Sequence, residues 1–469
     1  MISTRRETIV GLGTLLALGT RAEAAPSVTA SFEGRQISAG ENRPGVPMGS
    51  TNDALLAFYH LRLPPDQIAG KLKLPSAEVE RRTNALVQEG LARRLPNGQA
   101  RPTALVVTRA EQPRFLYAQH SVVRAAADAI GTILPVVRRR YATLPGFAHV
   151  PFADASLLVL SDGLLDNWQI NRVEEGYIKV LRPQRGGGRY YYAVFETRPG
   201  DPVESFGIYG NHGQGVGDTT LSLYGNQRYS GPTNLVTLEP GDLTSRFGFP
   251  PGTGVQAAQE ELVGDLLQRW RDPSAPVNKA RAAGLRSLGL LAANGRTAIP
   301  VLGPADDAGL DAMAAAFAPS LLAILEKHRS ALEAQYRNSP YAAEGVSFPE
   351  YFIWWYHVFY TDVTNELALR RMIVMPRNGT LTYLVTSRPA RCRNLTVTIA
   401  GIDIIPSHFS VRDGFREGSC FPDLPSLRER LVESSYLLAT GASRYPELWN
   451  SKVRLLLAPA QRLSRYPDE

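Results

Sequence analysis

The chain lacks the short motifs that mark several common enzyme classes. It has no H-E-x-x-H, which excludes the zincin helix, and no C-x-x-C, which excludes a thioredoxin motif or a cysteine-based zinc ribbon. It has no G-x-S-x-G elbow and no S-x-x-K, so the common serine hydrolases and penicillin-binding types gain no support. Its seven histidines are scattered without metal-ligand spacing. No metal or cofactor is therefore evident, and the sequence does not decide whether the protein is an enzyme.

Long apolar runs are also absent. No segment beyond residue 25 has about 18 consecutive apolar residues, so the sequence predicts no transmembrane helix there. A hydrophobic content of 44% and a charged content of 20% are typical of a globular protein. The 469 residues are too many for one ordinary core, which predicts two or three domains.

The N-terminus has the three parts of a secretory signal. Arg5-Arg6 precede a short apolar stretch over residues 9–19, and Ala22-Glu23-Ala24 provides a small-x-small cleavage site. The order resembles a twin-arginine (Tat) signal, although Thr8 replaces the large apolar residue that this signal prefers. The resemblance implies a signal peptide over residues 1–25 and a bacterial protein that is periplasmic or secreted. An uncleaved signal would leave a membrane tether.

Export would determine the oxidation state of the two cysteines, Cys392 and Cys420. In an oxidising periplasm they can form a disulfide that closes a loop of about 30 residues and contributes about 3 kcal/mol in the chain-entropy model. Two buried free thiols are the alternative. Without the signal, the net charge falls from +7 to near +6, which permits contact with acidic polymers and does not demand it. Residues 26–50 are rich in Gly, Pro, Ser and Asn, which predicts a flexible linker.

Residues 51–110 have the clearest pattern in the chain. Three amphipathic helices precede a strand, a Pro96-Asn97-Gly98 turn and a second strand. The pattern resembles the winged-helix domain of the MarR or ArsR type. The segments that carry the resemblance are Ile68-Ala69-x-x-Leu72-x-Leu74-x-x-x-x-Val79 and Leu86-Val87-x-x-Gly90-Leu91.

A winged helix implies candidate contacts to DNA, because its third helix enters the major groove. The candidates are Arg81, Arg82, Asn84, Arg93 and Arg94. Two glutamates in the same helix would repel phosphates, and an exported protein meets no chromosome. We therefore expect the module to serve packing or protein contact if the signal is real.

Residues 111–145 predict a long connecting helix, and residues 146–469 predict an α+β domain that can be divided into subdomains 146–254 and 255–469. The larger domain is expected to hold a mixed or antiparallel sheet covered by helices. Within it the pattern predicts a strand at 156–160, an Ala-rich helical stretch over 306–336 that breaks near Pro319, and an aromatic helix at 349–367. Strands are expected at 371–375, 380–386 and 395–399, and helices at 424–438 and 446–457.

One polar cluster follows the apolar run at 156–160. Asp162 and Asp166 are four residues apart and would share one face of a helix, with Asn167 and Trp168 beside them. Such a set could bind a cation or a sugar, since indole rings stack on sugars and carboxylates accept their hydroxyl hydrogens. The alternative is that Asp162 caps a turn and Trp168 belongs to the core.

Other polar side chains lie near expected strand ends and in the aromatic helix. Asn211 and His212 open a Gly-rich loop without the order of a phosphate-binding loop, and Asn226 ends a neighbouring strand. His357 and Tyr360 share a helix face, where a histidine is more often part of the core than a catalyst.

These patterns lead to three hypotheses for the function. The main hypothesis is an exported protein that binds an unknown ligand or protein partner through a polar-aromatic cleft in the α+β domain. The second is a periplasmic hydrolase whose cleft uses Asp162, Asp166, His212 and His357. The third is a DNA-binding regulator whose N-terminus resembles a signal only by chance. Such a regulator would bind duplex DNA with an affinity that depends on salt concentration.

Overall fold

The structure is a computed structural model of the chain. It describes residues 32–38, 42–112, 115, 120–197, 208–226 and 233–386, together with the strands β11 (Val397–Ile399) and β12 (Ile402–Ile404), which pair antiparallel. The predicted signal peptide, Cys392, Cys420 and the two expected C-terminal helices lie outside the described residues. Helices and open sheets are both present, so the α+β class is confirmed.

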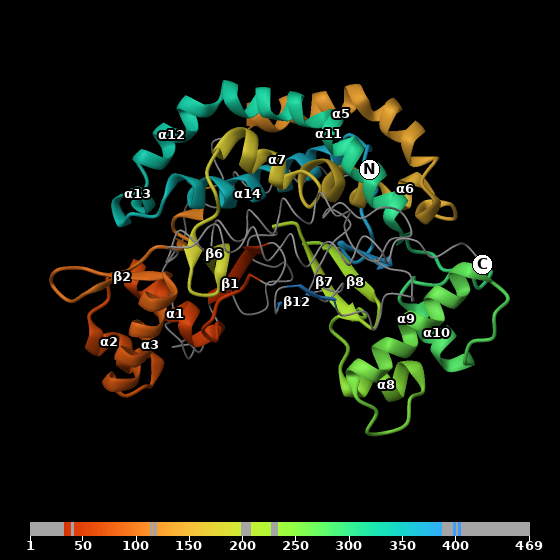
Figure 1. The fold of residues 1–469 in the computed structure, drawn as a ribbon, viewed down its shortest axis with the longest axis horizontal. Coiled ribbons are helices and arrows are strands. Elements are labelled where there is room, and N and C mark those ends of the chain that lie inside the picture. Colours follow the sequence, from red (N-terminus) through yellow and green to blue (C-terminus); the bar gives the residue numbers. More distant parts are fainter. Residues whose placement is uncertain are drawn as a thin grey trace, which may run out of the picture.

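The described part of the molecule forms an arch (Figure 1). The longest helices lie at its top, two further groups of helices form its arms, and strands lie between the arms and the top. The apolar core divides in the same way. One large cluster of buried side chains lies under the top helices, and each arm has a smaller cluster of its own.

The first half of the chain builds one arm and one sheet. The arm, which we call the first module, consists of α1 (Ser50–His60), α2 (Pro65–Leu72), α3 (Ser76–Glu89), the hairpin of β2 (Ala92–Arg94) and β3 (Ala100–Pro102), and β4 (Leu105–Val107). β6 (Gly188–Glu196) is the central strand. It pairs antiparallel with β1 (Phe32–Ser38), parallel with β4, and at its start with β5 (Gln184–Arg185).

Between β4 and β5 the chain crosses the top of the arch. The elements there are α5 (His120–Tyr141), η2 (Pro145–Phe147), α6 (Phe152–Leu157), the π-helical turn η3 (Leu158–Gly163), α7 (Ile170–Val173) and the π-helical turn η4 (Glu174–Ile178).

The second half builds the other arm and the second sheet. The arm, which we call the second module, consists of α8 (Pro240–Phe247), α9 (Val255–Arg271), α10 (Lys279–Ser287) and β9 (Val301–Leu302). The remaining helices are α11 (Pro304–Lys327), α12 (Arg329–Arg337), α13 (Pro340–Glu344) and α14 (Phe348–Leu369). β10 (Thr380–Thr386) is central in the sheet. It pairs antiparallel with β8 (Thr219–Gly225), which pairs with β7 (Gly210–Val216), and parallel with β9.

The two halves repeat one plan. In each half a strand precedes three helices, a tight hairpin and a short strand, and a long helix then leads over the top to the central strand. The short strand is parallel to the central strand and the first strand is antiparallel to it, in both sheets. The long helices α5 and α11 pack on each other, while α14 packs on α5 and η3 on α11.

Local hydrogen bonds repeat as well. After α3, Gly90 adopts a φ of 81°, and Leu91 N donates to Leu86 O at 2.9 Å. After α10, Gly289 has a φ of 75°, and Leu290 N donates to Leu285 O at 2.9 Å. Both glycines occupy the left-handed region that ends a helix at low cost without a Cβ. The hairpin turns then place Asn97-Gly98 and Asn294-Gly295 in equivalent positions, with glycine φ values of 81° and 82°.

Several local predictions differ from the structure, among them the Gly-rich loop expected from Asn211, which forms the strand β7. Residues 156–160 are helical, because a short apolar run buried on all sides fits a helix as well as a strand. The segment 371–375 is not a strand. The helix α11 continues through Pro319, which is exposed, and ends only at Lys327. Part of the predicted linker 26–50 forms β1, whose backbone pairs with β6 along its whole length.

The aromatic helix and the strand at 380–386 are present as α14 and β10. The three helices and the hairpin of residues 51–110 also form, although the assignment to the winged-helix type and the domain boundaries stay predictions. By length and composition alone, α5 and α11 could cross a membrane. This is weak evidence, because helices that pack in a protein core have the same composition, and both contribute side chains to the large core cluster.

Candidate functional site

A cavity of about 850 Å³ lies where the two sheets approach each other beneath the top helices. Its walls come from β1, from the segment after η3, from β7 and β8, and from α14 and β10. Both halves of the repeated plan therefore contribute to it. Of the candidates from the sequence, it is lined by Asp166, Asn167, Trp168, Asn211 and His357.

Asp162 lies directly behind two of the lining residues. It is fully buried, and its Oδ2 accepts hydrogen bonds from Asn211 Nδ2 at 3.0 Å and from the Tyr383 hydroxyl at 3.1 Å. Asn211 Nδ2 also contacts the Tyr383 hydroxyl. Burial and the charge of Asp162 raise the pKa of Tyr383 well above its usual value, so this phenol keeps its proton and acts as a donor. Asp162 thus positions Asn211 and Tyr383 at the wall of the cavity.

Asp166 and His357 form a second polar group. The backbone nitrogen of Asp166 donates to Ser161 O at 3.1 Å, a five-residue spacing that comes from the π-helical turn η3. His357 Nε2 lies 4.0 Å from Asp166 Oδ1, and both side chains are buried. The other ring nitrogen, Nδ1, lies 2.8 Å from Ile353 O. Because a carbonyl oxygen can only accept, Nδ1 carries the proton and Nε2 faces the carboxylate.

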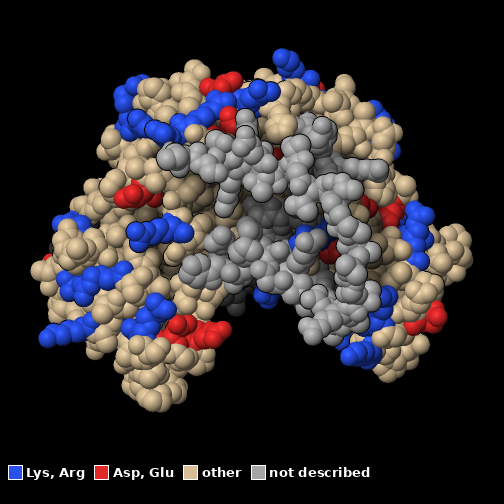
Figure 2. All heavy atoms as spheres, turned by 180° about the vertical axis from the view of Figure 1, so that it is seen from behind, with Lys and Arg blue, Asp and Glu red and all other residues tan. Residues whose placement is uncertain are grey.

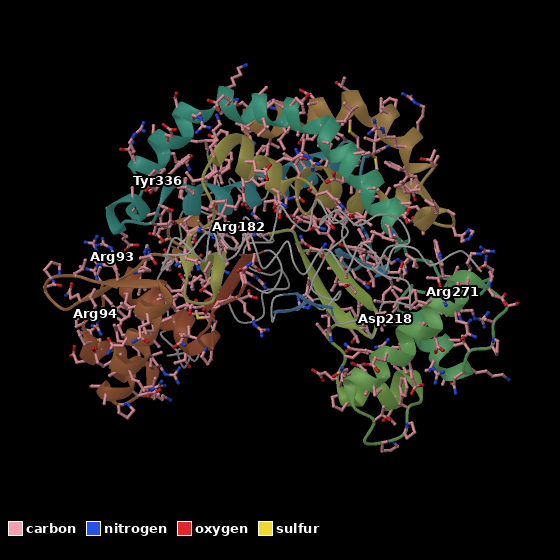
Figure 3. All side chains as sticks on the ribbon, in the orientation of Figure 1. Arg93, Arg94, Arg182, Asp218, Arg271 and Tyr336 are labelled. Atoms are coloured by element: carbon pink, nitrogen blue, oxygen red, sulfur yellow. The ribbon has the colours of Figure 1, made fainter. Side chains whose placement is uncertain are left out.

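Trp168 and Arg182, which line the cavity, are each held by a carboxylate. Trp168 Nε1 donates to Asp307 Oδ1 at 2.8 Å, near the start of α11. Arg182 Nε donates to Glu174 Oε2 at 2.9 Å, and its Nη2 contacts Asn171 Oδ1 at 3.3 Å. Figure 3 shows Arg182 near the middle of the arch, beneath the top helices. These bonds fix an indole and a guanidinium beside the buried carboxylates.

Three of the predicted site residues lie elsewhere. His212 is next to Asn211 on β7, and successive side chains of a strand point to opposite faces, so it faces away from the cavity. Asn226 follows β8, where its backbone nitrogen donates to Gly379 O. The Tyr360 hydroxyl donates to Tyr209 O at 2.9 Å, which fixes the chain at the entry to β7.

The candidate DNA contacts in the first module bind neighbouring groups of the protein. Arg81 and Arg82 both pair with Glu78, at 2.7 and 2.8 Å. Arg94 Nη2 donates to Glu80 Oε1 and to Asn84 Oδ1. Arg93 donates to the carbonyl oxygen of Glu344 at 2.8 Å and so joins the module to α13.

The positions of these arginines agree with a role in contacts within the protein. Figure 3 places Arg93 and Arg94 on the outer side of the first module. On the face drawn in Figure 2, basic side chains predominate on the left arm, and side chains of both signs are mixed over the top and the right arm.

The residues that the structure describes contain no group of three or more His, Cys, Asp or Glu side chains placed to hold a metal ion. No protein-family model, curated protein or solved structure matches the chain.

Sequence reasoning missed several lining residues. Tyr383, Asp307 and Trp354 come from three different elements and Arg182 from a loop, and none lies next to the cluster at 162–168 in the sequence. Tyr383 is one of several alternating side chains in a strand, and Asp307 is one of two acidic residues in the first turn of α11. Their patterns indicate a strand face and a helix start, respectively, and carry no sign of a cavity.

Proposed function

We propose that the protein binds a small ligand rich in hydroxyl groups, of the carbohydrate class, in the central cavity. The observation that carries this proposal is the convergence of Asp166, Asn211, Trp168 and His357, from three separate segments, on one cavity between the two halves.

The chemistry of the walls favours this ligand class. The carboxylate of Asp166 and the amide oxygen of Asn211 can accept hydroxyl hydrogens, while the Asn211 amide hydrogens and the Tyr383 hydroxyl hydrogen are donated within the wall of the cavity. Trp168 and Trp354 add apolar edges to the cavity wall, although both indoles are almost completely buried. A volume of about 850 Å³ is within the usual range of small-molecule sites.

The test is calorimetric titration of the full chain with soluble cell-wall saccharides. We expect binding, and we expect Asn211→Ala to weaken it about tenfold, since a lost hydrogen bond to a ligand costs about 1–1.5 kcal/mol. His212→Ala is the matched control, because it lies on the opposite face of the same strand. The proposal fails if no saccharide binds, or if both variants weaken binding equally.

Hydrolysis in the same cavity is a second candidate, favoured by the state of His357. In the neutral ring the proton is on Nδ1, and Nε2 beside Asp166 can then accept a proton from an attacking water. His357→Gln should then abolish turnover of a bound saccharide while its affinity stays within about threefold. Turnover that survives this substitution excludes the role.

We propose further that the chain is exported by its twin-arginine signal, and that the first module is a winged-helix-like unit used for packing. The bonds of Arg93 to Glu344 and of His60 to Glu111 and Glu344 support packing, since they tie the module to the rest of the molecule. The DNA-binding alternative is tested by titrating duplex DNA at two salt concentrations.

A further inference from the structure

The exposed edge of β10 is the starting point for a second site. β10 pairs with β9 only at Leu384 and Val385, and Leu384 N donates to Pro300 O at 3.0 Å. Alternate residues of a strand direct their backbone groups to the same edge, so Thr380 and Thr382 direct theirs to the edge that β9 leaves uncovered. No strand among the described residues pairs with β10 at that edge before Leu384.

The first half of the chain covers the equivalent edge. There, β4 pairs with β6 only from Ala193 onward. The edge before it is closed by a buried ion pair, in which Arg185 Nε donates to Tyr190 O and Glu350 Oε1 accepts from Tyr192 N. Arg185 and Glu350 are joined at 2.9 Å and are almost completely buried.

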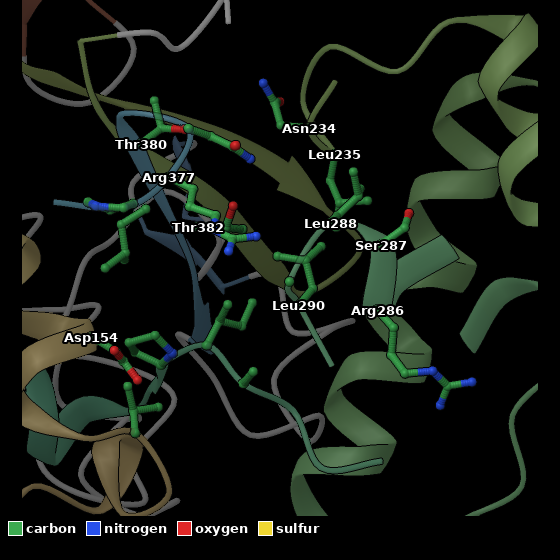
Figure 4. Close-up of a pocket in the computed structure, with 18 of the residues that line it drawn as sticks. Asp154, Asn234, Leu235, Arg286, Ser287, Leu288, Leu290, Arg377, Thr380 and Thr382 are labelled. Carbon is green, nitrogen blue, oxygen red and sulfur yellow. The ribbon is translucent and has the colours of Figure 1, made fainter. Parts of the chain in front are cut away.

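In the second half this place is a cavity of about 620 Å³ (Figure 4). Thr380 and Thr382 of β10 form one wall, and Leu288 and Leu290, which follow α10, form the opposite wall. An unpaired strand edge facing an apolar wall is the arrangement that receives an added strand, because the edge provides main-chain hydrogen bonds and the wall receives alternate side chains.

The charges at this cavity indicate the kind of strand. Arg286 and Arg377 line it, are both exposed, and make no ion pair within the described part of the chain. Asp154 is the one carboxylate among the lining residues. The cationic excess favours an acidic segment over a basic one.

We propose that this cavity binds an extended, acidic peptide of a partner protein, which adds a strand to the edge of β10 at Thr380 and Thr382. Valine-like side chains of the peptide lie against Leu288 and Leu290, and its carboxylates lie near Arg286 and Arg377. The site is separate from the central cavity and does not depend on the ligand proposed there.

The test is fluorescence anisotropy of the full chain with three labelled octapeptides. The first alternates valine and threonine and has aspartates at both ends, the second has lysines in place of the aspartates, and the third is the first with alternate backbone nitrogens methylated. We expect the acidic peptide to bind at least about tenfold more tightly than either of the others. An Arg286→Glu, Arg377→Glu double variant should reverse the preference between acidic and basic ends.

Amide hydrogen exchange gives an independent readout. The Thr382 amide should exchange fast in the unliganded full chain and slow down at least about tenfold with the acidic peptide, while the Leu384 amide stays protected throughout. Equal binding of the methylated peptide, no binding of the acidic peptide, or an unchanged charge preference in the double variant overturns the proposal. A Thr382 amide already protected without peptide also overturns it, since the edge is then covered by the chain itself.

Discussion

His60 joins three parts of the molecule through one imidazole. Its Nδ1 lies 2.7 Å from Glu344 Oε2 in α13, and its Nε2 lies 2.9 Å from Glu111 Oε1 in the segment after β4. Burial alone would lower the pKa of His60, but hydrogen bonds and charges of the two glutamates outweigh burial and raise this pKa to about 9. The imidazole is therefore charged in the folded protein at neutral pH.

This shift predicts a pH-dependent stability. A histidine with a raised pKa stabilises the folded state fully at pH values below its unfolded-state pKa of about 6.5. This stabilisation is lost as the pH rises through the folded-state pKa of about 9. The free energy of unfolding of the native chain, relative to a His60→Gln variant, should fall by up to about 3 kcal/mol between these pH values.

Urea unfolding at a series of pH values measures the effect. A native chain and a His60→Gln variant with parallel pH profiles would contradict the prediction.

The site residues show which side-chain positions can be predicted from the sequence and which cannot. The sequence predicted Asp162 and Asp166 on one helix face with Trp168 beside them, and the structure puts all three at or directly behind one cavity wall. Asn211 and His212 were equivalent candidates in the sequence, since a Gly-rich segment gave no strand register. The pairing of β7 with β8 separates them, and that pairing depends on contacts between distant residues.

At the scale of elements, the ion pair of Arg185 and Glu350 is the clearest test of how α14 holds the first sheet. Burial raises the pKa of Glu350 to about 7, although Arg185 and the Tyr192 amide oppose this shift. Glu350→Ala would leave a buried guanidinium and a buried amide without their acceptor. We expect it to lower the free energy of unfolding by about 3–5 kcal/mol.

Chemical denaturation of Glu350→Ala gives this value, and an Arg185→Met, Glu350→Leu double variant is the matched comparison. The double variant should lose less than Glu350→Ala alone, because removing both charges leaves no buried ion unpaired. A larger loss in the double variant would mean that packing of the long side chains matters more than their charge.

Replacement of Pro319 is expected to raise the free energy of unfolding, in contrast to Glu350→Ala. The sequence suggested that a helix would break there, since proline lacks the amide hydrogen that an internal helix position donates. The structure continues the helix because α11 is held on both sides of Pro319 by buried side chains, including Phe317 and Leu321. Pro319→Ala should therefore restore a hydrogen bond and raise the free energy of unfolding by about 1–2 kcal/mol, less the entropy that proline removes from the unfolded chain.

Thermal unfolding of Pro319→Ala tests this, with Pro250→Ala as a control in a loop. A melting temperature of Pro319→Ala at or below that of the native chain would show that the helix already adapts to the proline at no cost.

At the scale of the whole molecule, the sequence predicted the α+β class and most helices but not the repeat. The two halves share few residues beyond the Gly-Leu that ends α3 and α10 and the Asn-Gly of the hairpins. Their hairpins also differ in length, which disrupts alignment by eye. The repeat is visible in strand order and in hydrogen bonds, which are properties of the folded chain.

Export is the prediction that belongs to the whole chain. The native protein should appear in the periplasmic fraction of a bacterial host, and an Arg5→Lys, Arg6→Lys double variant should remain in the cytoplasm, because the twin-arginine route depends on both guanidinium groups. If both proteins stay inside, the N-terminus is not a signal, and duplex DNA becomes the first ligand to test with Arg81→Ala and Arg94→Ala.

The central cavity has one further consequence. Since its walls come from both halves, neither half holds a complete site, and any ligand that fills it also bridges the two sheets. Two fragments that divide the chain between β6 and β7 would then assemble more readily when the ligand is present. The molecule could thus be converted into a reporter whose reassembly measures the concentration of its own ligand.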